Sequence, residues 1–530
     1  MARPPPSPSL FAQTGRELIF SDYGDDEEEE EEGEHGRRED DDDDAVELPT
    51  RRHDAFTLDE EREVCDLLDR RLVLFVALLY MLSFLDRSNI GNARIAGMEA
   101  DLQRTSSPRR DDWYEWSLTA FYLTYMTCEW LALLWRFVPA HVLVSSLVLT
   151  WGLAASFQAV ATSYPVLIAL RAVLAVGEAG FAALPLYLSF FFRRDELAVR
   201  TGIFIAAAPL ASSFASALAW LILRFASLGP IAPWRLLFLA EGFPSVLASV
   251  IAWTRIPDGP GSAAFLSRRQ RRVARLRLLS SDSNPTTHDD QHHRVLTDPV
   301  AWLTAVILLL ANMAYASLPV FLPLLVRDMG HGPVTAQALS APPFLFAAAV
   351  VVVTARLSDR LRGRTAPLVF HAITSATGYA LLAAAPLLRL SPLVRYLALF
   401  PAAAGFFSVV TLVITWNINN QPGRHGQGLA FALMQFIGQL GPLVGTRLYP
   451  ARHAPFYTPG MLVCACAMST VAVLGLVLRR LLRRRNLGMD RADDEKLAEE
   501  RERLVGQAVT TMTKAKTTAA AAAPRFRYML

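Results

Sequence analysis

Twelve long apolar runs, six before a polar segment and six after it, restrict the fold of this chain more than any other feature. A helix of about 20 apolar residues crosses the ~30 Å hydrocarbon core of a bilayer. A soluble fold would have to bury twelve such helices completely, so we expect an all-α membrane protein with twelve transmembrane helices. The predicted spans are residues 72–93, 113–135, 143–161, 166–190, 201–223, 234–253, 301–326, 335–355, 368–388, 394–416, 429–446 and 460–478.

The composition excludes the usual soluble classes. Only 19% of the 530 residues are charged and 52% are hydrophobic, whereas soluble domains carry about 25% charged residues. Many of the charges lie in one acidic segment, from Asp22 to Glu47, which we expect to be disordered. The basic residues lie between the apolar runs and form no single patch, so no nucleic-acid partner is expected.

The polar segments divide the chain into five parts. We expect a disordered acidic tail at 1–70, an N-terminal six-helix bundle at 71–255, a linker at 256–299, a C-terminal six-helix bundle at 300–480 and a second tail at 481–530. Two bundles around a central cavity are typical of alternating-access transporters, whose substrates bind near the middle of the membrane.

Arginines between the apolar runs predict the orientation, because positive charge favours the cytosolic side. With a cytosolic N-terminus, the connections after the even-numbered spans face the cytosol. The arginines at these connections are Arg136, Arg193, Arg194, Arg200, Arg356, Arg360, Arg362, Arg364, Arg424 and Arg479. The first outer loop departs from the rule with Arg104, Arg109 and Arg110. On balance we expect a plasma-membrane protein with both termini in the cytosol.

Neither a metal nor another cofactor is expected. The four cysteines, Cys65, Cys128, Cys464 and Cys466, form no disulfide framework, and Cys464 and Cys466 lie in an apolar run as packing residues. The sequence contains no nucleophile–base set and no phosphate-binding loop, so we do not expect an enzyme.

Four charged residues lie inside the first and fourth predicted spans. A charge at the centre of a membrane helix costs at least ~2.5–3.5 kcal/mol unless it faces water or a partner. Asp86 and Arg87 follow Leu72 too closely for the first helix to have crossed the membrane, at ~1.5 Å per residue. Arg171 and Glu178 are two turns apart on one face of the fourth span.

Two interpretations of these charges remain open. In the structural one, they form two ion pairs that lock helices together. In the functional one, Arg87 and Arg171 bind an anionic substrate, because the planar guanidinium donates two parallel hydrogen bonds to a carboxylate. Asp86 and Glu178 then carry protons, since burial and a neighbouring arginine tune the acids for that task.

Other polar residues are weaker candidates. For cavity-lining positions we consider Tyr125, Asn312, Tyr315, Gln435 and Gln439, with an interhelical hydrogen bond as the alternative for those of the C-terminal half. The loop after the eighth span contains Asp359, Arg360 and Arg364. We expect these three to bridge helix ends on the cytosolic side and to separate when the gate there opens; the alternative is a simple positive loop.

The sequence resembles the major facilitator superfamily. The six-plus-six plan and the turn at 357–364, which is similar to the loop signature G-x-L-a-D-r-x-G-r-[KR], carry the resemblance. That loop normally follows the second span, where 135–139 here lack the Asp and the Gly. A finer resemblance, to the fungal allantoate and nicotinate permease branch of the anion:cation symporter family, is carried by 84–97, 170–181, 238–244, 438–450 and 526–530.

This resemblance implies proton-coupled uptake of a small organic anion. By their positions in the matching motifs, Asp86 and Glu178 would be the proton-binding acids and Arg87 and Arg171 the substrate-binding arginines. Similar relatives carry nicotinate, allantoate, pantothenate, biotin, sulfonates or cysteine-like compounds, so the resemblance does not name the solute.

The prediction is therefore a monomeric secondary active transporter of the major facilitator fold. Its expected partners are a small carboxylate-bearing or vitamin-like anion, protons and the lipid bilayer. Two rivals remain: an exporter or exchanger on the same fold, and a nutrient sensor that binds solute without transporting it.

Overall fold

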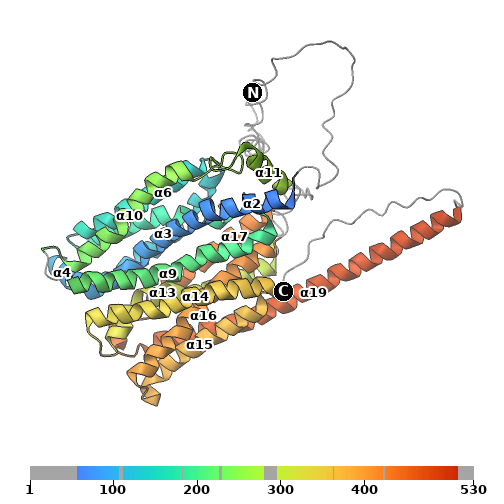
Figure 1. Ribbon diagram of the computed structural model, residues 1–530. Helices are drawn as coiled ribbons and strands as arrows, with labels where there is room; N and C mark the ends of the chain where they lie inside the picture. The colour runs from blue at the N-terminus through green and yellow to red at the C-terminus, as the bar shows by residue number, and fades with distance from the viewer. Residues whose placement is uncertain are drawn as a thin grey trace, which may run out of the picture.

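The chain folds into side-by-side helices that form one elongated bundle (Figure 1). The computed structural model describes residues 56–106, 112–181, 183–225, 230–279, 295–361, 363–421 and 424–510, and these ranges contain helices but no strand. The acidic segment from Asp22 to Glu47, the residues Arg109, Arg110 and Arg362, and the C-terminal stretch 526–530 lie outside the described residues. The prediction of an all-helical protein is confirmed.

The N-terminal half holds the first six predicted spans. Gly97, with φ of 101°, allows the chain to turn between the first span and the short helix α4. The helices of this half are α3 (Leu74–Ala93), α4 (Glu99–Thr105), α5 (Trp113–Thr127) with a 3₁₀ continuation (Glu129–Arg136), α6 (Ala140–Phe157), α7 (Tyr164–Phe181), α8 (Leu184–Leu188), α9 (Arg194–Phe225) and α10 (Pro233–Arg255).

The C-terminal half holds the other six. Proline stands in the first turn of α13, α14 and α16, as of α10, where its missing N–H removes no helical hydrogen bond. The helices are α13 (Pro299–Arg327), α14 (Pro333–Arg360), α15 (Thr365–Leu388), α16 (Pro392–Asn419), α17 (Arg424–Gly438), α18 (Leu440–Gly445) and α19 (Thr458–Thr510).

All twelve predicted spans coincide with helix, although their apolar character differs. Within the described residues, 10 helices are long and apolar enough to cross a membrane. The first two predicted spans are not among them: α3 carries polar and charged residues in its last turns, and α5 has only 15 residues before the 3₁₀ segment begins. These two helices contribute to the polar centre described below.

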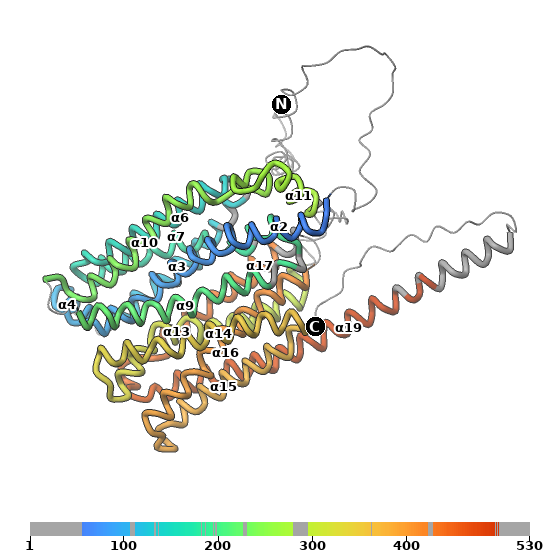
Figure 2. The backbone as a smooth tube through the Cα atoms, in the orientation of Figure 1, coloured from blue at the N-terminus to red at the C-terminus, as the bar shows by residue number. Residues whose placement is uncertain are grey.

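The predicted boundaries of the tails and the linker differ from the structure. The expected tail ended at residue 70, whereas Leu58–Leu68 form helix α2, because Thr57 and Glu60 close a reciprocal capping box. The first part of the linker forms α11 (Arg268–Leu279), which packs on α2. Helix α19 continues past residue 480 and leaves the bundle (Figures 1 and 2).

The two halves meet tightly at the end of the bundle where α3 and α13 finish, here called the Arg94 end. A Cβ on Gly91 would lie 2.1 Å from the carbonyl oxygen of Val320, so glycine is required for this contact. The Nε of Arg447 donates to the Thr119 hydroxyl over 3.0 Å. The described contacts thus close the Arg94 end, while α9 and α14 join the halves side by side (Figure 2).

Candidate functional site

The four charged residues predicted from the sequence come together where α3 packs near α7. The guanidinium of Arg87 donates to Glu178 Oε2 from Nη2 over 2.6 Å and from Nε over 2.8 Å. Arg171 donates from Nη1 to the carbonyl oxygen of Asp86, over 3.4 Å, and from Nη2 to that of Arg87, over 3.1 Å. Arg171 and Glu178 lie two turns apart on one face of α7. They therefore bind α3 at two places: Glu178 at the Arg87 side chain and Arg171 at the backbone carbonyl oxygens of Asp86 and Arg87.

Burial makes this cluster unusual. Asp86, Arg171 and Glu178 are 1–2% exposed, while the Arg87 side chain keeps 13%. Asp86 Oδ1 and Glu178 Oε1 are buried without a hydrogen-bond partner. Buried charges are costly unless they are paired or neutralised. A proton bound at either of these two oxygens would neutralise the carboxylate and so remove the cost of burying its charge.

Aromatic rings from α3 and α5 surround the two guanidinium groups. The Arg87 guanidinium carbon lies 4.9 Å from the ring centre of Tyr125 and 5.3 Å from that of Phe121, and the Arg171 guanidinium carbon lies 5.2 Å from Phe121. Such contacts stabilise a cation without neutralising it. Tyr125, which the sequence suggested as a cavity-lining residue, lies beside Arg87 and is 4% exposed. Phe121 was missed because an aromatic residue in an apolar run carries no distinguishing signal.

Tyr315 of the C-terminal half contacts α3 close to the charged cluster. Its hydroxyl lies 2.9 Å from that of Tyr80, and its ring packs edge-on against Phe84. Phe406 and Phe407 of α16 pack behind it. An aromatic wall of the C-terminal half thus faces the first span.

Asn312 joins two helices of the C-terminal half. Asn312 Nδ2 donates to the carbonyl oxygen of Gly438 over 3.1 Å, the interhelical alternative left open above. Gln439 is 7% exposed at the break between α17 and α18, and Gln435, one turn earlier, is half-buried. The hydrogen bonds described for Asn312 and for the Gln435 and Gln439 backbone stay within α13 and α17–α18.

The predicted gating residues occupy the opposite end of the bundle, here called the Arg364 end. Arg364 forms an ion pair with Asp359, and its Nη1 donates to Ser358 Oγ over 2.8 Å. These contacts connect the end of α14 to the start of α15. Arg360 is exposed. The structure therefore brings Asp359 and Arg364 together and leaves Arg360 at the surface.

Two residues of α10 were missed. Ser245 Oγ donates to Asp86 Oδ2 over 2.8 Å. Glu241, one turn before Ser245, is 1% exposed, and neither of its carboxyl oxygens has a hydrogen-bond partner. A lone acid inside the apolar run 234–253 is the same signal that identified Glu178, so the sequence contained the means to find it.

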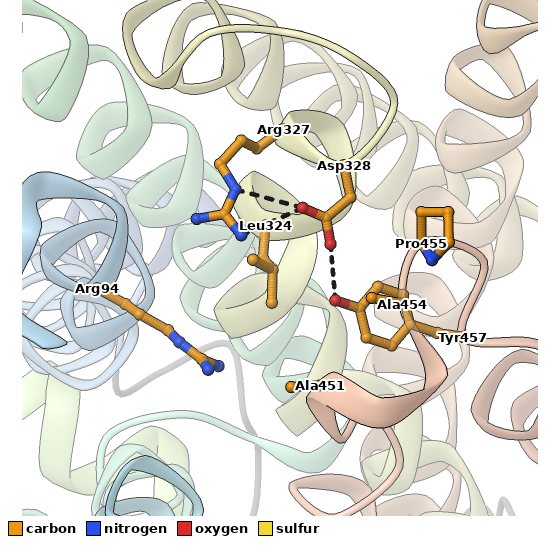
Figure 3. A pocket seen from close by; sticks show the side chains of 8 residues that line it. All are labelled: Arg94, Leu324, Arg327, Asp328, Ala451, Ala454, Pro455 and Tyr457. Atoms are coloured by element: carbon orange, nitrogen blue, oxygen red, sulfur yellow. Dashed lines mark hydrogen bonds and ion pairs between the residues drawn. The ribbon is translucent and has the colours of Figure 1, made fainter. Parts of the chain in front are cut away.

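A pocket of about 360 Å³ opens at the Arg94 end, between the two halves. Figure 3 shows Arg94 on one side and Arg327, Asp328 and Tyr457 on the other. The Tyr457 hydroxyl donates to Asp328 Oδ2 over 2.7 Å. Arg94 is itself paired with Glu99 at 2.8 Å, so the pocket has basic groups from both halves that already have acidic partners.

Among the described residues, no group of three His, Cys, Asp or Glu side chains is placed to hold a metal ion. Cys464 is buried against Tyr449, and Cys466 is exposed.

Comparison with known proteins supplies the context for this geometry. Residues 76–446 match the Major Facilitator Superfamily. The chain is similar to the MFS transporter prlL of Fungal sp. (strain NRRL 50135), at 31% identity over 78% of this chain and 84% of that one. It is also similar to the high-affinity nicotinic acid transporter of Saccharomyces cerevisiae, at 25% identity over 76% of this chain and 74% of the relative.

Solved structures share the fold. The proton:xylose symporter XylE, solved with 6-bromo-6-deoxy-D-glucose, matches with a TM-score of 0.62 and 13% identity, covering 78% of this chain and 95% of that chain. A bacterial homolog of the human lysosomal transporter Spinster matches with a TM-score of 0.54. The sequence match across most of the helical region, with this fold, shows that the chain belongs to the Major Facilitator Superfamily and is an integral membrane transporter rather than an enzyme.

Proposed function

We propose that this transporter takes up a small carboxylate-bearing anion together with protons, as a member of the allantoate and nicotinate permease branch of the anion:cation symporters. The observation that carries the proposal is the buried pair between Arg87 and Glu178, with Arg171 on the neighbouring turns. An arginine that is held by an ionisable acid can exchange that acid for another carboxylate. The similarity to a nicotinic acid transporter supports the choice of a carboxylate.

The exchange follows from charge balance. When Glu178 binds a proton, Arg87 loses its anionic partner and becomes available to the carboxylate of the substrate. The guanidinium offers that carboxylate a planar, two-point contact, which a lysine ammonium does not. The buried charge is the same before and after, so the substrate anion and the proton enter together at little electrostatic cost. Loss of the proton restores the Arg87–Glu178 pair and displaces the anion.

The rest of the molecule fits alternating access. We place the Arg94 end on the extracellular side of the plasma membrane and both termini in the cytosol. The two six-helix halves of a monomer then rock about the charged centre. The pocket between Arg94 and Arg327 then lies on the outer approach, and the Asp359–Arg364 pair lies beside the cytosolic gate. Gln435 and Gln439 would meet the far end of the solute from the C-terminal half.

The test is uptake by the purified full-length protein in liposomes. With radiolabelled nicotinate as the probe, we expect accumulation above equilibrium only when the outside is more acidic than the lumen. Equal counterflow with no response to the pH gradient would contradict proton coupling and favour an exchanger. Binding of nicotinate without any uptake or counterflow would favour a sensor. A matched panel of small neutral analogues, nicotinamide first, should neither bind nor be taken up.

A further inference from the structure

Glu241 introduces a third acid into the charged centre of the N-terminal half. It lies eight residues into α10, about 12 Å along the helix from its start. Ser245 follows one turn later on the same face and donates to Asp86. The face of α10 that carries Glu241 is therefore the face that meets Asp86 of α3. The two carboxyl groups therefore belong to one site between α3 and α10.

This site lacks the cation that two ionised carboxylates would require. Asp86 Oδ1 and both oxygens of Glu241 are buried without a partner. Arg87 is committed to Glu178. Arg171 donates from both Nη groups to backbone carbonyl oxygens and not to the carboxylate of Asp86 or Glu241. Its positive charge nevertheless lies near Asp86. Arg87 balances Glu178, and Arg171 balances one further acid, which leaves one negative charge too many.

No other charged group described around α10 corrects the balance. Helices α3, α6, α9 and the segment after α3 pack against it. In the segment after α3, Arg94 is paired with Glu99 at the Arg94 end. On α6, His141 contacts Asp258 at the other end, and on α9, Arg200 contacts Asp69 there. Arg235, in the first turn of α10, donates to the carbonyl oxygen of Ala159 and lies over the Trp234 ring. The remaining arginines of α9 and α10 in this region, Arg224 and Arg255, are exposed at the helix ends.

We propose that Asp86 and Glu241 form a proton-binding site in which one of the two carboxyl groups carries a proton. This proton supplies the missing positive charge, and Ser245 orients Asp86 by donating to its second oxygen. This site is separate from Glu178, which faces Arg87. Its contribution to coupling rests on the proposed symport, because a proton held here can accompany the anion in addition to the one bound by Glu178.

The occupancy of the site is measurable without any substrate. Infrared difference spectroscopy of the purified full-length protein, titrated with acid and base, reports the C=O stretch of a protonated carboxyl. We expect the wild-type protein to keep such a signal at neutral pH and Glu241→Gln to lose it, because Asp86 alone is then balanced by Arg171. Asp86→Asn should lose it as well, and this second variant decides the matter if the first does not fold.

Controls separate this site from other acids. Glu99→Gln should leave the carboxyl signal unchanged, because Glu99 is an ion-paired carboxylate. A signal that persists unchanged in both Glu241→Gln and Asp86→Asn would overturn the proposal. Since the infrared measurement contains no nicotinate, that outcome would not refute the proposed uptake of nicotinate. Conversely, loss of the signal in a protein that does not carry nicotinate would support the proton site while refuting the proposed substrate.

Discussion

The two halves of the bundle bury very different chemistry. In the N-terminal half, Asp86, Arg171, Glu178 and Glu241 are nearly inaccessible within helices α3, α7 and α10. In the described part of the C-terminal half, the buried arginines, Arg364 and Arg395, lie near helix ends. The middle of that half is instead lined by Tyr315, Phe406 and Phe407.

This difference assigns separate tasks to the halves. Charged groups in a low-dielectric interior hold an anion and exchange protons, but each needs a partner at every stage. An aromatic wall gives shape and excludes water without changing charge. We infer that the N-terminal half binds the anion and couples its transport to protons, and that the C-terminal half closes over the bound solute.

Glu178→Gln should abolish accumulation while leaving exchange. The amide can still accept a hydrogen bond from Arg87 but cannot take up or release a proton. We therefore expect nicotinate counterflow without a pH gradient to continue, and pH-driven accumulation to fall to the equilibrium level. Glu115→Gln, another buried acid of the same half, serves as the control. Accumulation that survives in Glu178→Gln would remove this acid from the coupling.

Arg171→Lys should weaken substrate binding strongly. An ammonium group cannot reach the two carbonyl oxygens that Arg171 joins and present a flat face to a carboxylate as well. Losing hydrogen bonds from a charged donor costs about 2 kcal/mol, or roughly a 30-fold rise in KM for nicotinate uptake. The matched control is Arg235→Lys, because Arg235 also donates to a backbone carbonyl, that of Ala159, outside the cluster. Equal effects of the two variants would make Arg171 a purely structural residue.

Much of this architecture can be predicted from sequence, for definite physical reasons. Apolar runs located all twelve helices, and the cost of burying charge identified Asp86, Arg87, Arg171 and Glu178 from the sequence alone. The partners of these groups could not be predicted, because they depend on how α3, α7 and α10 rotate against one another. Phe121 and Tyr125 show the same limit: both are aromatic residues of one helix, and their proximity to Arg87 is a tertiary fact.

The boundaries were missed for a different reason. Helix α2 is short and polar, and its stability depends on a capping box together with contacts to α11, such as Glu60 with Arg269. Neither feature produces an apolar run. Asn312 illustrates a choice that sequence leaves open, since a buried amide serves equally as a ligand or as an interhelical bond until its partner, the Gly438 carbonyl, is known.

Gly91→Ala tests the close contact between the two halves at the Arg94 end. The new methyl group would overlap the Val320 carbonyl, and overpacking of this kind costs about 1–3 kcal/mol. We expect the Arg94 end to open more often, by about tenfold. Labelling of a Val320→Cys variant by a membrane-impermeant maleimide measures the opening, because Val320 is buried at this contact. Gly332→Ala, where a Cβ meets open space, should not change labelling. Unchanged labelling in Gly91→Ala would mean that this contact does not govern closure.

Tyr315→Phe should have the smallest effect, and it addresses the aromatic half directly. The substitution keeps the ring against Phe84 and removes only the hydrogen bond with Tyr80. A neutral hydrogen bond is worth about 1 kcal/mol, so the KM for nicotinate should change by no more than roughly fivefold. Tyr396→Phe, which removes a hydroxyl bonded to the Leu339 carbonyl within the C-terminal half, should leave KM unchanged. If Tyr315→Phe instead weakened uptake as severely as Arg171→Lys, the tyrosine hydroxyl would have to bind the anion itself. The C-terminal half would then share in recognition, and the division of tasks between the halves would fail.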